Sequence, residues 1–296
     1  MGKMKLPTTK QVQQFRQEIL DTMEEIAIDI PSQTNNLKYS QYANQRDIIN
    51  RAFQCRGYSR CEIIARLAIL DVFYSTNVNR RYFGFDDMAD AILSLGTRQQ
   101  ACDYFYSIAC GAKDTKNVFS ATYGIHKNGG NFGRATSLMS KYAYYELLQN
   151  KNRYPLGFPI YDSLVRLIYP KVSRKLGIAR PMLKPTRNNA RIEDYIDRLN
   201  DLRIAIFGNN ANYFNGFQQF DILDAYLWRM GKFEVGNLSI LLKKADYLIF
   251  INNVPLNGFP TFIDAVRAAL KQGQPIFNGC SNNAFMSVLH SNWLKL

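Results

Sequence analysis

Two residues in the middle of the chain, Lys141 and Asp162, offer an amine and a carboxylate that could act in one space. The amine of a lysine attacks carbon when it is neutral, and a carboxylate stabilises positive charge that develops beside it. Both actions require side chains that are held in place. The elements that carry the two residues therefore decide whether they can act together.

A helix is predicted over residues 134–149, because apolar residues recur at three- and four-residue steps and no glycine or proline interrupts them. Lys141 lies within this helix. A turn-rich connector over 150–159 follows, and Asp162 then precedes an apolar run that begins at Leu164. We expect Asp162 to cap the next helix, where the dipole and the free backbone N–H groups favour its ionised form.

This order of a helical lysine, a short connector with an apolar-proline run and an aspartate that opens the next helix resembles the helix-hairpin-helix DNA glycosylases, and among them the 8-oxoguanine DNA glycosylase-like branch. The resemblance implies that Lys141 is the nucleophile and Asp162 the catalytic carboxylate. The family's hairpin usually has an apolar residue, Pro, Gly, an apolar residue and Gly just before the lysine. Here Ser137 to Ser140 occupy that place, and the glycines lie earlier, at Gly129, Gly130 and Gly133.

Two further segments, 73–81 and 220–232, are similar to the parts of that branch that approach the base. The resemblance covers roughly residues 60–170 and this late helix, and it implies a base pocket. The candidate pocket residues are Ser75, Thr76, Asn77, Tyr161 and Trp228. A helix terminus and ordinary packing explain the first four equally well, and Trp228 is also a natural core residue.

The chain is strongly basic, with 37 Lys and Arg against 24 Asp and Glu, a net charge of +13 and a pI near 9.5. Such a balance favours nucleic acid or an anionic membrane surface, and charge alone does not choose between them. No apolar run approaches the roughly 20 residues of a membrane span, and no signal-peptide pattern is present. We expect a cytoplasmic, nucleoid-associated monomer without a membrane partner.

Basic residues gather near the candidate site. From 163 to 192 there are eight of them and no acid, and the glycine-rich stretch before residue 134 adds more. The alternative is a solvated linker broken by Pro181 and Pro185. We predict DNA contacts from Lys127, Arg134, Arg166, Lys171, Arg174 and Lys175.

Cofactor and metal sites are not expected. The five cysteines are odd in number and irregularly spaced, and one of them lies beyond residue 110, so neither a disulfide framework nor an iron-sulfur cluster is predicted. The two histidines, His126 and His290, lack zinc-ligand spacing. His126 is an ordinary loop residue or a phosphate contact.

An all-α, mainly helical fold is predicted, and the resemblance implies two lobes with the site in the cleft between them. Capping boxes at Ser59 to Glu62 and Thr97 to Gln100 start two helices, and Asp86 caps another between them. The helix over 63–73 is apolar around most of its circumference, so we expect it to be central and buried. The other predicted helices cover 10–29, 41–55, 191–200, 217–230 and 261–272.

A glycine-bearing stretch over 111–133 is predicted to be a long loop, and residues 245–252 form either a strand or part of a helical region. We divide the chain into N-terminal helices over 1–57, a glycosylase-like core with the catalytic segment over 58–170, and a basic connector with a C-terminal helical region over 171–296.

Together these features predict a DNA repair glycosylase with associated abasic-site lyase activity, acting on duplex DNA that contains a damaged or modified base. Base flipping would expose the base, Asp162 would stabilise the sugar cation, and Lys141 would form the Schiff base. A free lysine has a pKa of about 10.4, so this mechanism requires burial or nearby cations. The alternatives are an inactive DNA-binding protein of the same fold and an RNA-binding or scaffold protein.

Overall fold

The computed structural model describes residues 6–32, 37–74, 84–125, 131–178, 180, 182, 191–209 and 214–231. Residues Met1–Trp228 form one compact unit and Arg229–Leu296 a second. The helix and the strand considered over 261–272 and 245–252 lie outside the described residues. Most of the described residues belong to the first unit.

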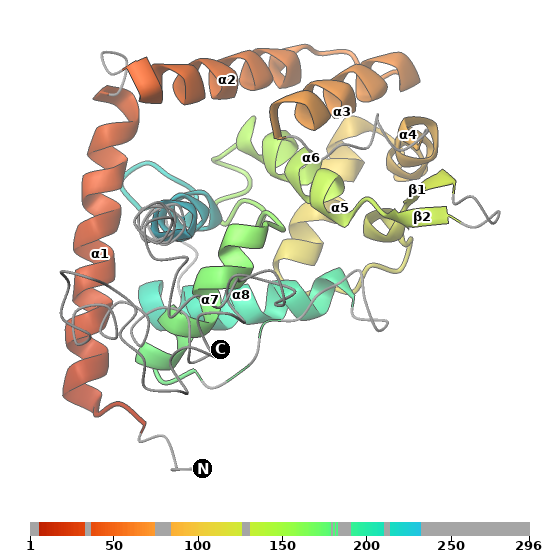
Figure 1. The fold of residues 1–296 in the computed structure, drawn as a ribbon. Helices are drawn as coiled ribbons and strands as arrows, with labels where there is room; N and C mark the ends of the chain where they lie inside the picture. The colour runs from red at the N-terminus through yellow and green to blue at the C-terminus, as the bar shows by residue number, and fades with distance from the viewer. Residues whose placement is uncertain are drawn as a thin grey trace, which may run out of the picture. The chain divides into compact units, whose positions relative to one another are not determined.

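The unit is mainly α-helical, as predicted, and Figure 1 shows how its helices are arranged. The helices are α1 (Thr9–Ser32), α2 (Leu37–Gln54), α3 (Arg60–Tyr74), α4 (Phe85–Leu93), α5 (Arg98–Ala109), α6 (Thr136–Leu148), α7 (Ser163–Lys175), α8 (Ile192–Phe207) and a last helix over 219–231.

Three predicted helix starts are confirmed by their hydrogen bonds. Ser59 N donates to Glu62 Oε2 at 2.7 Å ahead of α3, and Thr97 forms the complete capping box of α5 with Gln100. Asp162 caps α7 by accepting from Leu164 N at 2.7 Å. Each of these caps satisfies backbone N–H groups that a helix terminus otherwise leaves without partners.

The predicted cap of α4 is wrong. Gly84 occupies the N-cap position without a side-chain hydrogen bond, and Asp86 lies in the first turn. The Asp86 carboxylate instead pairs with Arg60 at 3.2 Å. An acidic residue in the first turn is favoured by the helix dipole, so Asp86 supports the helix start without capping it.

The central helix is α6 and not α3, which corrects the prediction for residues 63–73. All residues of α6 except Ser137 are buried, and α2, α3, α5 and the 3-10 turn η3 (Val118–Ser120) pack against it (Figure 1). Helix α3 buries one face only, and Val72 on its outer side is 64% exposed. Its apolar circumference was therefore a poor guide to its place in the fold.

The predicted loop over 111–133 contains ordered structure. Strands β1 (Thr122–Ile125) and β2 (Asn131–Arg134) pair antiparallel, and η3 precedes them. The buried Asp114 carboxylate accepts from Val118 N and Phe119 N, each at 3.1 Å. This local anchor explains how a polar, glycine-bearing segment becomes ordered before it enters α6.

A buried carboxylate on α6 joins the helices around it. Glu146 pairs with Arg66 of α3 at 3.4 Å and with Arg98 of α5 at 2.7 Å. The same two arginines donate to backbone carbonyls at the C-terminal end of α2 and just beyond it, among them that of Cys55. Carbonyls in the last turn of a helix have no partner within the helix, so this ion cluster also closes α2.

Replacement of Glu146 by Gln should therefore lower the free energy of unfolding by about 3–5 kcal/mol, because it leaves two arginines facing a neutral group in the interior. Chemical denaturation measures the change. The matched control is Asp47→Asn, which alters the solvent-exposed pair with Arg51 and should change stability little. Equal effects of the two substitutions would contradict the structural role given to Glu146.

Candidate active site

The amine of Lys141 is enclosed by the protein. The side chain is 2% exposed, and Nζ donates to Ser137 Oγ at 2.8 Å and lies 5.1 Å from the centre of the Tyr74 ring. Burial lowers the pKa of Lys141 from its ordinary value, and the negative charges of Asp162 and Asp224 oppose that shift. The structure thus supplies the burial that a nucleophilic lysine needs.

Asp162 is positioned by the serines that precede Lys141. Ser137 Oγ donates to the carbonyl of Tyr161 at 3.1 Å, and Tyr161 N donates to Ser140 Oγ at 2.9 Å. The carbonyl and the N–H of Tyr161, the residue before Asp162, are therefore both hydrogen-bonded to side chains of α6. Ser137 and Ser140 thus fasten the lysine-bearing helix to the residue before Asp162.

Asp224, on the helix over 219–231, is a site residue that the sequence analysis did not select. Burial raises its pKa to about 8, the charge of Asp162 adds to the shift, and Lys141 opposes it. The only pattern that pointed to it is its spacing from Asp221, which puts two acids on one face of the late helix.

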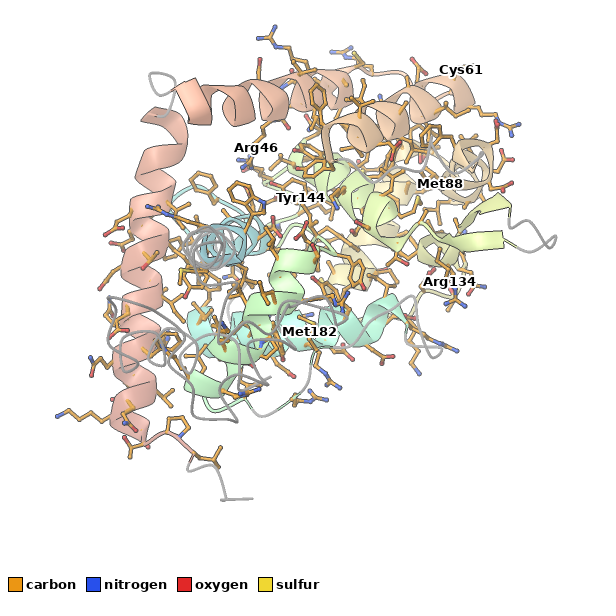
Figure 2. All side chains as sticks on the ribbon, in the orientation of Figure 1. Arg46, Cys61, Met88, Arg134, Tyr144 and Met182 are labelled. Atoms are coloured by element: carbon orange, nitrogen blue, oxygen red, sulfur yellow. The ribbon has the colours of Figure 1, made fainter. Side chains whose placement is uncertain are left out.

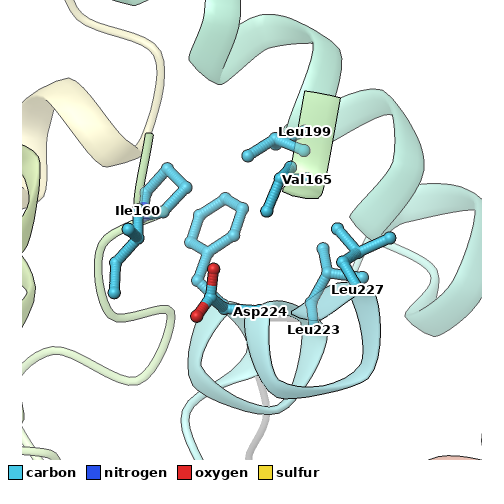
Figure 3. A pocket seen from close by; sticks show the side chains of 8 residues that line it. Ile160, Val165, Leu199, Leu223, Asp224 and Leu227 are labelled. Carbon is cyan, nitrogen blue, oxygen red and sulfur yellow. The ribbon is translucent and has the colours of Figure 1, made fainter. Parts of the chain in front are cut away.

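The Asp224 carboxylate lies among apolar side chains at a cavity of about 10 Å³, roughly the space of one water molecule (Figure 3). The residues that line this cavity with it are Pro159, Ile160, Val165, Leu199, Phe220, Leu223 and Leu227. Their character explains why the charged form of Asp224 is disfavoured.

Tyr195 of α8 closes another side of the site, and sequence analysis missed it as well. Its hydroxyl donates to the carbonyl of Ile160 at 2.8 Å, and its ring meets the ring of Tyr161 edge to face with centres 5.0 Å apart. Burial raises the pKa of Tyr195 well above its ordinary value, and Asp224 and Asp162 add to the shift. Tyr195 is therefore a neutral hydrogen-bond donor that holds the connector before Asp162.

The predicted base-pocket residues are only partly brought to this site. Tyr161 is buried between Tyr195 and Arg166, and Trp228 is partly buried on the last helix. Three of them, Ser75, Thr76 and Asn77, lie outside the described residues, as do Lys127 and His126.

The predicted DNA-binding residues that the structure describes lie on different elements. Arg134 is exposed at the end of β2 (Figure 2), and Arg166 lies over the Tyr161 ring near the site. The Lys171 amine is shielded from solvent. Arg174 and Lys175 occupy the last turn of α7, about 18 Å along the helix from Asp162 at 1.5 Å per residue. A tract that is continuous in sequence is thus spread along the length of α7.

Within the described residues there is no group of three or more His, Cys, Asp or Glu placed to hold a metal ion. The described helices also include none that is long and apolar enough to cross a membrane. No protein-family model, curated protein or solved structure matches the chain.

The hydrogen bonds to Tyr161 give a testable stability prediction. Ser137→Ala and Ser140→Ala should each lower the free energy of unfolding by about 1–3 kcal/mol, because each leaves a backbone group of Tyr161 without its partner. Chemical denaturation measures this. Ser107→Ala is the matched control, since the Ser107 hydroxyl is exposed and donates to the carbonyl of Tyr104. If all three variants lost the same stability, the two serines would not be what fixes Asp162.

Proposed function

We propose that this protein is a DNA glycosylase with associated abasic-site lyase activity, a two-lobed helical enzyme whose site lies in the cleft between the lobes. One observation supports this most directly. Lys141 is buried on α6 with a lowered pKa, and the charge of Asp162, which caps the next helix, acts on its amine. This is the pair that Schiff-base chemistry at a sugar carbon requires.

In this proposal the substrate is duplex DNA that contains a damaged or modified base. The base leaves the stack, and phosphate contacts offset the few kcal/mol that unstacking costs. As the bond to the base breaks, Asp162 stabilises the positive charge on the sugar. The neutral amine of Lys141 attacks C1′ and forms an imine, and the imine permits β-elimination of the 3′ phosphate.

Phosphate contacts are assigned to basic side chains at two distances from the site. Arg166 and Arg134 are the nearer candidates along the chain, and Arg174 and Lys175 extend the surface along α7. The net charge of +13 supports a polyanionic partner. Lys127 stays a predicted contact.

One observation favours a second candidate, a DNA-binding protein of the same fold without catalysis. Lys141 is 2% exposed and lies against the Tyr74 ring, so a sugar carbon reaches the amine only after the covering side chains move. In the second candidate Lys141 is an interior cation that binds no substrate. The two candidates differ in whether the amine ever bonds to DNA.

The experiment is a panel of lesion-containing duplexes assayed for base excision and strand nicking. Lys141→Gln should reduce nicking by at least about a thousandfold, because glutamine cannot form an imine. DNA binding should persist, since glutamine has a similar helix propensity and the phosphate contacts are unchanged. Lys113→Gln, at an exposed lysine, is the matched control and should nick normally.

Wild-type protein that binds the duplexes and nicks none of them would favour the non-catalytic candidate. Nicking that survives in the Lys141 variant would assign the chemistry to another amine.

A further inference from the structure

Two hydrogen bonds fix how the last helix lies along α6. Gln218 Nε2 donates to the carbonyl of Leu147 at 3.2 Å, and Tyr144 OH donates to Asp221 Oδ1 at 2.5 Å. From the first contact to the second, the residue on α6 changes from Leu147 to Tyr144, three positions earlier. Its partner changes from Gln218 to Asp221, three positions later. The two helices therefore run antiparallel with matched one-turn steps.

The next step of this register places Lys141 opposite Asp224. Residues three apart lie on the same face of a helix, so Lys141 shares a face with Tyr144, and Asp224 shares one with Asp221. The mutual electrostatic effect of Lys141 and Asp224 agrees with this placement. Arg46 stabilises the contact between Tyr144 and Asp221, because its guanidinium donates to both side chains. Figure 2 shows Arg46 beside Tyr144.

The charges at this place do not balance if every group is in its ordinary state. Lys141 brings one positive charge, and Asp162 and Asp224 bring two negative ones. Arg46, whose charge also acts on Asp224, is bonded to Asp221 at 2.8 Å. A charge without a partner in an apolar setting is costly, so this excess of negative charge favours a proton on one of the two carboxylates.

The surroundings decide which carboxylate holds that proton. Asp162 accepts a backbone N–H at the N-terminus of α7, which is a polar setting at the positive end of the helix dipole. Asp224 lies among seven apolar cavity residues that favour its neutral form. Two carboxylates in such different surroundings, one polar and one apolar, can have different chemical roles.

We propose that Asp224 is a positioning residue that governs the protonation of Lys141: it is a neutral carboxylic acid in the resting site, and its ionisation places a second negative charge beside the amine and keeps Lys141 an ammonium. The step is the loss of one proton from the carboxyl O–H to solvent. The role of this ionisation in catalysis rests on the proposed function, whereas the protonation of Asp224 itself does not.

The groups that face Asp224 are known from each element around it. They are Lys141 on α6, Asp162 at the start of α7, Tyr195 on α8, Arg46 on α2 and Asp221 on the same helix. Burial and Asp162 raise the pKa of Asp224 to about 8, against about 3.9 for an unfolded aspartate. The folded state therefore binds more protons than the unfolded state between these values, and this group makes stability fall as pH rises from about 4 to about 8.

The test compares Asp224→Asn with Asp162→Asn, two isosteric changes at carboxylates that face the same lysine. In Asp224→Asn the pH at which borohydride trapping on abasic DNA is half-maximal should fall by about one unit or more, because the negative charge that holds the ammonium is gone. Asp162→Asn should instead lose base excision by about a hundredfold, since the stabiliser of the sugar cation is removed.

A second measurement needs no DNA. The free energy of unfolding is followed against pH, and the fall between about pH 4 and 8 should be smaller in Asp224→Asn than in wild type. If this difference is found and wild type shows no trapping, Asp224 is protonated as proposed and the proposed enzymatic function is rejected. An identical pH dependence of stability in the two proteins, or a loss of trapping at every pH in folded Asp224→Asn, would overturn the proposal.

Discussion

A charge that is buried in a protein must be paired or neutralised, and the central helix α6 carries two such charges, Lys141 and Glu146. Glu146 takes Arg66 and Arg98 from α3 and α5. Lys141 faces carboxylates that come from the start of α7 and from the last helix. The partners of one helix thus come from four neighbours, so satisfying its charges also places the elements around it.

The two charges differ in what they do for the fold. The Glu146 cluster is one carboxylate held by two arginines, and the same arginines complete the end of α2, which gives the cluster a structural role. Lys141 with two carboxylates is a poor stabiliser, because well-packed apolar residues often replace buried ions without loss. A costly buried amine that faces a helix-capping aspartate contributes little to stability, and this is why we propose a chemical role for that pair.

Sequence predicted those features that depend on neighbouring residues. The capping boxes and the Asp162 cap each involve residues two or three apart, and they form as expected. Asp224 and Tyr195 escaped notice because their places depend on the register between distant helices, which no short pattern records. The same limit explains α3, whose apolar surface did not show which neighbours would cover it, and the hairpin after Asp114, which depends on one buried carboxylate.

We propose that the Lys141 amine bonds to the sugar of damaged DNA. Peptide mapping of a borohydride-reduced protein–DNA complex by mass spectrometry identifies the residue that forms this bond. Reduction converts an imine into a stable secondary amine, so the residue that carries the sugar fragment is the nucleophile. We predict the modification on Lys141 and on no other lysine. A fragment on a different lysine or on the terminal amine would contradict the proposal that Lys141 is the nucleophile. A lesion duplex that binds and yields no adduct would contradict it as well.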